Sequence, residues 1–277
     1  MRTQDFSAPA LIRSIEANAV DGIKAWARWP KLTLREKPEI AWTLSPIPSP
    51  LFNAVLRTRM AQKNADDLIE EALDGFHSLP MTWWVGPRDQ PADLGDRLEA
   101  RGLTCAGVAA GMAADLSSLP ENPPATKGLS IEEVRDATAL RGCFRVIAPV
   151  CGFPDFAARA WLDIHNALGL DGPWRHFLAK VDGKPAAASS LFLGSRAAGI
   201  ANVAALPDVR RRGIGTAISL SPLRLARRMG YRVATLFSSP MAEGMYRKMG
   251  FRKYCEGRGY IRLDGPSRPA RRRRPES

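Results

Sequence analysis

The segment from Val203 to Ala217, which reads VAALPDVRRRGIGTA, constrains the fold of this chain more than any other. An apolar run ends at Pro207, three arginines follow, and two glycines precede apolar residues at helical spacing, which predicts a strand, a basic turn and the start of a helix. The first amides of a helix lack an intrahelical acceptor and lie at the positive end of its dipole, so they can bind a phosphate. Gly213 and Gly215 carry no Cβ, so an anion can approach the backbone closely. We interpret the segment as a pyrophosphate cradle.

The basic charge of the chain is concentrated in the part that contains this cradle. Residues 1–120 hold 13 Lys and Arg against 15 Asp and Glu, whereas residues 121–277 hold 27 against 13. Such a field favours an anionic ligand without identifying it. A chain of 277 residues with 45% hydrophobic content can also bury two cores, and we predict two domains.

Periodicity and composition place the domain boundaries. Residues 1–120 are predicted to form an N-terminal α/β domain that opens with an amphipathic helix over 8–28 and contains a strand over Met81–Val85. The proline-rich stretch 117–128 ends in a linker at 121–128, residues 129–264 form a second domain, and the Arg-rich tail 265–277 is predicted to be disordered. The helix after the cradle contains Pro222, which predicts a kink or a short break.

The cysteines and the N-terminal residues bear on the cellular compartment in which the protein works. Cysteines at positions 105, 143, 151 and 255 form no CxxC pair and have no zinc spacing, which predicts buried thiols in a reducing compartment and no metal site. The first residues lack the apolar core of a signal peptide, and no apolar run approaches the roughly 20 residues of a membrane-spanning helix. We expect a cytoplasmic protein without a membrane partner.

Two further sequence motifs, together with the cradle, resemble those of a known protein family. The segment Arg210-Arg-Arg-Gly213-Ile-Gly215 resembles the acetyl-CoA loop of the GCN5-related N-acetyltransferases (GNAT family), and Tyr246-Arg-Lys-Met-Gly250-Phe251 resembles that family's Tyr-x-x-x-Gly-Phe block. Between them, Ser238-Ser-Pro-Met-Ala242 is similar to a serine-containing variant of a segment that carries an asparagine in many members. The elements occur in the family's order, and the resemblance covers about residues 128–264. Two other phosphate-binding loops do not fit this segment. A dinucleotide-binding loop needs a third glycine where Ile218 stands, and a P-loop needs Gly-Lys-Ser/Thr, which is absent here.

The resemblance implies a fold, a cosubstrate and a binding site. The fold is α/β (α+β), with a mixed, largely antiparallel twisted sheet flanked by helices, and the cosubstrate is acetyl-CoA. The N-terminal domain resembles the extension of some bacterial members and is a candidate degenerate copy of the same fold without a phosphate loop. The implied cofactor-binding residues are Val203, Ala204, Ala205, Arg210, Arg211, Arg212, Gly213, Ile214, Gly215, Thr216 and Ser239. For the cradle itself, a glycine-rich tight turn with solvated arginines is the alternative.

Tyr246 is the candidate catalytic residue. In direct transfer an amine attacks the acetyl carbonyl, and a phenol can protonate the departing thiolate; the alternative is a tyrosine that packs under the cofactor. A general base is harder to identify, because the strand before the cradle carries Asn202 and no carboxylate. Asp155, Glu132 and Glu133 are candidates, each with a surface or capping role as the alternative. Buried positions in the core or at a sheet edge are expected for His165 and His176.

We therefore predict an N-acetyltransferase that moves the acetyl group of acetyl-CoA directly to an amine of a small molecule or a peptide. One alternative is a catalytically inactive acyl-CoA-binding regulatory module, favoured by the missing carboxylate. Another is a nucleic-acid-associated protein that works through Arg271–Arg274, although no aromatic residues interleave with these arginines. The sequence identifies neither the acceptor nor the oligomeric state.

Overall fold

A computed structural model describes residues 4–120 and 126–263 of the chain. These residues divide into two compact units, one containing residues 1–33 and 108–258 and the other containing residues 34–107 and 259–277. The predicted tail at 265–277 and most of the predicted linker lie outside the described residues. Among the described residues, no helix is long and apolar enough to cross a membrane.

The larger unit is a mixed sheet with helices on both faces. Its strands lie in the order β5-β10-β9-β8-β7-β6, and every neighbouring pair is antiparallel except β9 with β10. The predicted mixed, largely antiparallel sheet is therefore confirmed. The strands are β5 (Thr104–Asp115), β6 (Leu129–Glu133), β7 (Trp174–Val181), β8 (Lys184–Leu193), β9 (Ala198–Ala205) and β10 (Val233–Ser238), and β11 (Arg252–Arg262) follows at the end of the chain.

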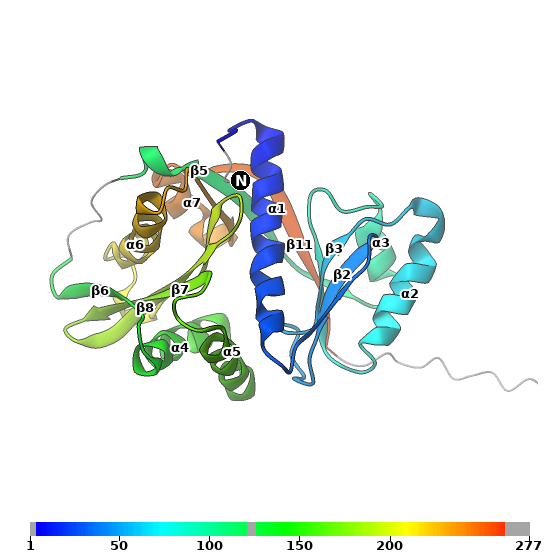
Figure 1. Ribbon diagram of the computed structural model, residues 1–277, viewed down its shortest axis with the longest axis horizontal. Helices are drawn as coiled ribbons and strands as arrows, with labels where there is room; N and C mark the ends of the chain where they lie inside the picture. Colours follow the sequence, from blue (N-terminus) through cyan, green and yellow to red (C-terminus); the bar gives the residue numbers. More distant parts are fainter. Residues whose placement is uncertain (1–3, 121–125, 264–277) are drawn as a thin grey trace, which may run out of the picture. The chain divides into compact units, whose positions relative to one another are not determined.

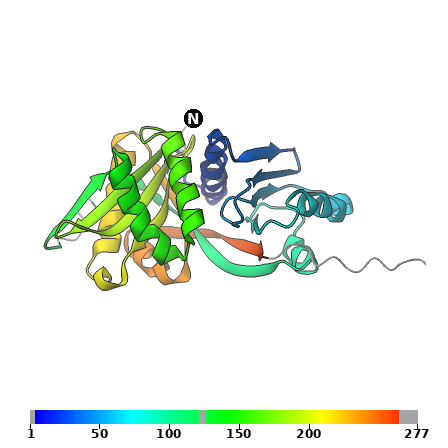
Figure 2. The ribbon, with the colours of Figure 1, turned by 90° about the horizontal axis from the view of Figure 1, so that it is seen from below.

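Helices α4 (Ala137–Cys151) and α5 (Asp155–Leu168) lie on one face of the strands, and α6 (Ile214–Arg228) lies on the other (Figure 1). Seen from below, α4 and α5 run side by side across the strands (Figure 2). Short α7 (Pro240–Lys248) follows β10 and shares the core on the α6 side. Buried apolar side chains of the strands and of α6 fill that core. They include Leu191, Ile200 and Leu236 of the strands and Ile218 of the helix.

Helix α1 (Ala8–Lys24) belongs to the larger unit, although it lies at the opposite end of the sequence. Leu11 and Ile15 pack against a cluster that includes Val233, and Asn18 Nδ2 donates a 2.8 Å hydrogen bond to the carbonyl of Ala197. The division by contacts thus differs from the predicted boundary after residue 120. The reason is that the apolar face of this helix is buried on the second domain's sheet.

The smaller unit repeats part of the same order of elements. It contains β1 (Thr33–Glu36), β2 (Ile40–Leu44), β3 (Ala54–Thr58), α2 (Ala65–Gly75), β4 (Met81–Val85) and α3 (Leu94–Glu99), with its own core around Trp83 and Phe76. Strand β2 is antiparallel to β3, and β3 is parallel to β4 across α2. In the larger unit, β8 is likewise antiparallel to β9, and β9 is parallel to β10 across α6. In both units a short helix follows the second strand of this parallel pair, α3 after β4 and α7 after β10.

Helix α6 is continuous from Ile214 to Arg228 with Pro222 inside it, so of the two predicted outcomes, a kink or a short break, the break does not occur. Proline has no N–H, which leaves the carbonyl of Ile218, four residues earlier, without its helical partner. Ser189 Oγ of β8 donates a 2.8 Å hydrogen bond to that carbonyl. A side chain from the sheet therefore satisfies the group that the proline leaves open, and the helix continues.

The cysteines only partly match expectation. Cys143 is buried, but Cys105 and Cys255 are half-buried and Cys151 is exposed at the last residue of α4, so the prediction of four buried thiols is wrong. In the described part of the chain, no group of three or more His, Cys, Asp or Glu side chains could hold a metal ion.

Candidate functional site

Strands β9 and β10 pair only at their beginnings. Ala198 is opposite Ala234 and Gly199 is opposite Thr235, after which β10 pairs with β5 alone and β9 with β8 alone. One edge of β9 from residue 200 to 205 therefore lacks a neighbouring strand among the described residues. Backbone N–H and C=O groups on such an edge need partners. This edge includes the segment Val203–Ala205, which the family resemblance implies to be part of the cofactor-binding site.

The predicted strand, turn and helix follow from this edge in order. Strand β9 ends at Ala205, a single 3₁₀ turn covers Pro207–Val209, and α6 begins at Ile214 with Gly213 as its N-cap residue. Gly213 has a φ of 78°, in the left-handed region that glycine adopts without a Cβ clash. The backbone therefore turns sharply and presents the first amides of α6, at Ile214, Gly215 and Thr216, at a helix N-terminus.

The three arginines of the turn differ in their surroundings. Arg210 Nε donates a 3.1 Å hydrogen bond to the carbonyl of Ala205, which folds this side chain back over the end of β9. Arg211 is exposed and has a φ of 61°, a strained conformation for a residue with a side chain. Arg212 is exposed, and its carbonyl accepts a 2.9 Å bond from Thr126 Oγ1.

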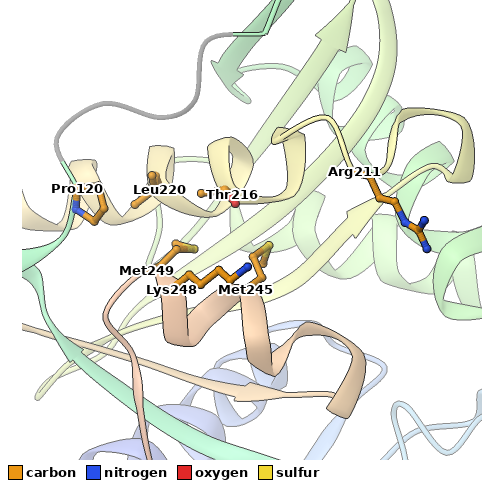
Figure 3. Close-up of a pocket in the computed structure, with 7 residues that line it drawn as sticks. All are labelled: Pro120, Arg211, Thr216, Leu220, Met245, Lys248 and Met249. Atoms are coloured by element: carbon orange, nitrogen blue, oxygen red, sulfur yellow. The ribbon is translucent and has the colours of Figure 1, made fainter.

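A cavity of about 650 Å³ lies beside the turn, between α6 and α7. Figure 3 shows Thr216 and Leu220 of α6 facing Met245 and Lys248 of α7, with Arg211 at the end nearer the loop. Pro120 and Met249 also line the cavity. The cavity combines apolar walls with two cations, a composition that fits an anionic ligand with an apolar arm. Two predicted residues, Arg211 and Thr216, line it.

Lys248 is a cavity residue that the sequence reasoning missed. It lies inside the Tyr246–Phe251 block, and its neighbour Arg247 forms an ion pair with Glu243 at 2.6 Å. In the described ranges no carboxylate forms an ion pair with Lys248 or Arg211. The available signal was helical spacing, because Met245, Lys248 and Met249 fall on one side of a helix that starts after Ser239.

Gly215 lies where α6 and α7 approach each other beside the cavity. A Cβ at this position would lie 3.2 Å from Met245 Sδ, so the Met245 side chain would have to shift by a few tenths of an ångström. The second predicted glycine of the cradle is therefore favoured by the close approach of α7 rather than by a positive φ, which it does not have. The side chain of Ile214 is buried in the core, so only the backbone of this residue can face a ligand at the start of α6.

Tyr246 lies on α7 with its ring in the core, 5% exposed, in an edge-on contact with Phe251. Burial raises the pKa of its phenol to about 12, and a hydrogen bond with Ser219 of α6 acts in the opposite direction. The phenol is therefore protonated at physiological pH, so it can donate a proton or a hydrogen bond but cannot act as a base. It lies beside the same pair of helices that line the cavity.

Ser239 precedes α7 and is exposed. Its side chain makes no capping hydrogen bond, whereas its carbonyl accepts from the amides of Ala242 and Glu243. The hydroxyl is thus free of any role in starting the helix. Ser239 is not among the residues that line the cavity.

The candidate general bases lie elsewhere. Glu132 and Glu133 are on β6, three strands from β9 in the sheet order. Lys180 is 2.7 Å from Glu132, and Arg135 is 2.7 Å from Glu133. Asp155 is exposed in the first turn of α5. The structure brings none of the three onto β9, and the ion pairs favour a surface role for the two glutamates.

A buried polar chain reaches β9 from the α5 side of the sheet. His165 Nδ1 is 3.0 Å from His176 Nε2, and His176 Nδ1 is 2.9 Å from Ser190 Oγ. Asn202 Nδ2 donates a 3.3 Å hydrogen bond to Ser190 Oγ. Both histidines are buried, as the sequence predicted, and they pack among aromatic rings that include Trp161 and Trp174. Of the four residues in this polar chain, only Asn202, on the strand before the cradle, is half-exposed.

Part of the chain matches a known family model. Residues 173–253, which contain β8, β9, the turn and both helices of the cavity, match the family model of the acetyltransferase (GNAT) domain. No curated protein matches the chain.

Solved structures of similar fold cover nearly the whole chain. A GCN5-related N-acetyltransferase from Kribbella flavida is 15% identical, with a TM-score of 0.67 over 89% of this chain and 96% of its own. Another from Sphaerobacter thermophilus is 15% identical, with a TM-score of 0.63 over 93% of each chain. A tandem GNAT protein from the clavulanic acid biosynthesis pathway is 16% identical, with a TM-score of 0.57 over 96% of this chain and 97% of its own. At these identities the likeness concerns the fold.

Proposed function

Residues 173–253 match the model of the acetyltransferase (GNAT) domain, and from this premise we propose that the chain is a GNAT-family acyltransferase that transfers the acetyl group of acetyl-CoA directly to an amine. The observation that carries the proposal is the unpaired edge of β9, which leads through a left-handed Gly213 into the N-terminus of α6. An extended acyl-pantetheine can bond along this edge, and its pyrophosphate then meets the helix amides.

Each part of the cosubstrate has a proposed partner. The backbone of Val203, Ala204 and Ala205 holds the thioester and the pantetheine, and the amides from Arg211 to Thr216 hold the pyrophosphate. Cationic side chains of the turn add charge-assisted hydrogen bonds, each contributing about 1.5–3 kcal/mol. Ser239, with no capping bond of its own, supplies a hydroxyl near the start of α7. The apolar walls of the cavity suit the uncharged arm of the cofactor.

In the proposed reaction the lone pair of a neutral amine attacks the acetyl carbonyl carbon, and the C–S bond breaks. The CoA sulfur leaves as a thiolate and takes a proton, while the amine nitrogen loses one to water. Tyr246 is the proposed proton donor or hydrogen-bond donor to the sulfur. Because burial raises its pKa to about 12, above the roughly 8.5 of an ordinary thiol, stabilisation by a hydrogen bond is favoured over complete proton transfer.

We infer that the smaller unit is a degenerate copy of the same fold without a cofactor site. Strand β3, which corresponds to β9 in the order of elements, is covered where β9 is open: the Gln90 amide bonds to the carbonyl of Thr58, and Asp89 Oδ1 accepts from the Thr58 amide at 2.8 Å. The helix that follows β3 carries Asp66 and Asp67 in its first turn, which disfavour a phosphate there.

The acceptor is proposed to be an amine of a small molecule or a peptide. A cytoplasmic site of action is also proposed, supported by four cysteines that form no disulfide in the described structure. A nucleic-acid partner has no support from the described residues, because the arginine run at 271–274 lies outside them.

A thiol-release assay tests the function. The full chain is incubated with acetyl-CoA and a panel of small amines, amino acids, aminoglycosides and peptide N-termini, and free CoA is measured. The expected result is amine-dependent release of CoA together with an acetylated product. Cofactor binding without release for any amine would overturn the transferase proposal and favour the inactive acyl-CoA-binding module.

A further inference from the structure

The polar chain from His165 to Asn202 has a direction, and that direction determines which atom Asn202 presents. Asn202 lies at an irregularity of β9, since Ser190 is opposite Ala201 while Ala188 is opposite Ala204. Two residues of β9 therefore oppose Ser189, a bulge, and Asn202 has a φ of 53° that asparagine tolerates better than most residues. The bulge turns the Asn202 side chain toward Ser190.

We assign the hydrogen-bond roles starting from the Asn202 end of the chain. The amide Nδ2 of Asn202 donates to Ser190 Oγ, and we assign the single hydroxyl proton of Ser190 to its other partner, His176 Nδ1. That nitrogen is then an acceptor, and a neutral His176 carries its proton on Nε2, which donates to His165 Nδ1. His165 in turn carries its proton on Nε2, a buried atom that has no hydrogen-bond partner among the described residues.

The imidazoles are uncharged in this arrangement. Burial lowers the pKa of His176 to about 3 and lowers the pKa of His165 well below its usual value. Buried aromatic rings surround the pair, with ring centroids of Trp161 and His165 only 4.0 Å apart. Two neutral rings with fixed tautomers make a rigid anchor.

One polar atom remains at the outer end of this chain. The carbonyl oxygen Oδ1 of Asn202 has no hydrogen-bond partner among residues 4–120 and 126–263, and the residue is half-exposed. It belongs to the stretch of β9 that has lost its neighbour β10. The helices on this side of the sheet are α4 and α5, whereas the cavity lies between α6 and α7 on the other side.

We propose that His165, His176 and Ser190 hold the Asn202 amide so that its Oδ1 accepts a hydrogen bond from the N–H of the acceptor amine. This role rests on the proposed function, with acetyl-CoA approaching from the α6 side and the amine from the α4 and α5 side. Asn202 is the residue that contacts the substrate, and the other three are positioning residues. A carbonyl oxygen holds an amine through its N–H and leaves its lone pair directed at the acetyl carbon.

The tautomers test the chain without any substrate. The protein has three histidines, so a long-range ¹H–¹⁵N spectrum of the imidazoles is simple to assign with single His→Gln variants. His165 and His176 are expected to be protonated at Nε2. Ser190→Ala should shift the Nδ1 signal of His176, and Asn202→Asp, whose carboxylate cannot donate, should move the His176 proton to Nδ1. A wild-type His176 protonated at Nδ1 would overturn the proposal.

Kinetics with an amine that gives turnover test the substrate contact. Asn202→Ala is expected to raise KM for the amine about 10-fold, the size of one hydrogen bond of about 1.4 kcal/mol, with KM for acetyl-CoA within twofold of wild type. Ser189→Ala is the matched control, because Ser189 is equally buried in β8 but faces α6. An unchanged amine KM in Asn202→Ala, with an active wild type, would refute this role alone. A wild type inactive with every amine would refute the proposed function itself.

Discussion

Ser189 Oγ donates a 2.8 Å hydrogen bond to the carbonyl oxygen of Ile218, and this bond connects β8 to the helix that carries the cradle. The carbonyl is available because Pro222 has no N–H to offer it. Both ends of the bond are fully buried in the core. The sheet thereby compensates for a proline that would otherwise leave a polar group unsatisfied.

Ser189→Ala is expected to lower the free energy of unfolding by about 1–3 kcal/mol, because the Ile218 carbonyl stays buried without a partner. In a Pro222→Ala background the loss should be smaller, since the new amide can bond to Ile218 within the helix. Denaturant unfolding of the two single variants and the double variant measures this coupling. Equal losses in both backgrounds would contradict the explanation.

Gly213→Val is expected to abolish acetyl-CoA binding while the chain stays folded. A β-branched side chain disfavours the φ of 78° and would occupy the space that the phosphate needs. Gly230→Val is the matched control, because Gly230 has a similar φ of 83° but follows the other end of α6. Calorimetric titration with acetyl-CoA measures binding, and circular dichroism measures folding. Wild-type affinity in Gly213→Val would remove the cradle from the cofactor site.

Lys248→Ala is expected to weaken acetyl-CoA binding about 10-fold or more and to reduce the dependence of affinity on salt. Its ammonium lines the cavity without a carboxylate partner in the described structure, so a ligand phosphate can pair with it. Arg247→Ala should leave binding unchanged, since Arg247 is paired with Glu243. Titrations at two salt concentrations compare the variants, and equal effects of both substitutions would argue against a specific role for Lys248.

The cradle could be predicted from the sequence because its determinants are local. Apolar residues before Pro207, the glycine at 213 and the helical spacing after it all act within a few residues of one another. The strand at 81–85 was predicted with its observed bounds for the same reason. Asp136 acts equally locally, because its side chain caps α4 through the amides of Thr138 and Ala139.

The polar chain behind Asn202 could not be predicted, because it depends on register. The turn at Asp182-Gly183 pairs Val181 with Lys184, and continuing this register would place Ser189 opposite His176. A bulge between Ala179 and Lys180 shifts the pairing by one residue, so that Ser190 is opposite instead. A shift of one residue exchanges the two faces of a strand. The packing of α1 was likewise hidden, since Asn18 and Ala197 lie 179 residues apart.

Tyr246→Phe is expected to lower kcat about 100-fold with an unchanged affinity for acetyl-CoA, if the phenol donates to the departing sulfur. Ser219→Ala keeps the phenol and removes its hydrogen-bond partner, together with the 2.8 Å bond from Ser219 Oγ to the carbonyl of Gly215, so a much smaller loss of kcat is expected. Steady-state kinetics with the best amine of the panel, together with binding titrations, separate the two effects. A nearly normal kcat in Tyr246→Phe would leave the tyrosine with a packing role against Phe251.

The two buried histidines should make stability depend on pH. The pKa of His176 falls to about 3 and that of His165 lies well below 6.5 in the folded chain, because burial disfavours their charged forms. The unfolded chain therefore binds more protons below about pH 6.5. The stabilisation is complete above this pH and is lost as the pH falls toward 3, at about 1.4 kcal/mol per pH unit for each histidine. Urea unfolding from pH 7 to pH 4 measures the slope, and His176→Gln, which cannot be protonated, should flatten it. A slope that this substitution does not change would mean that other groups control the acid sensitivity.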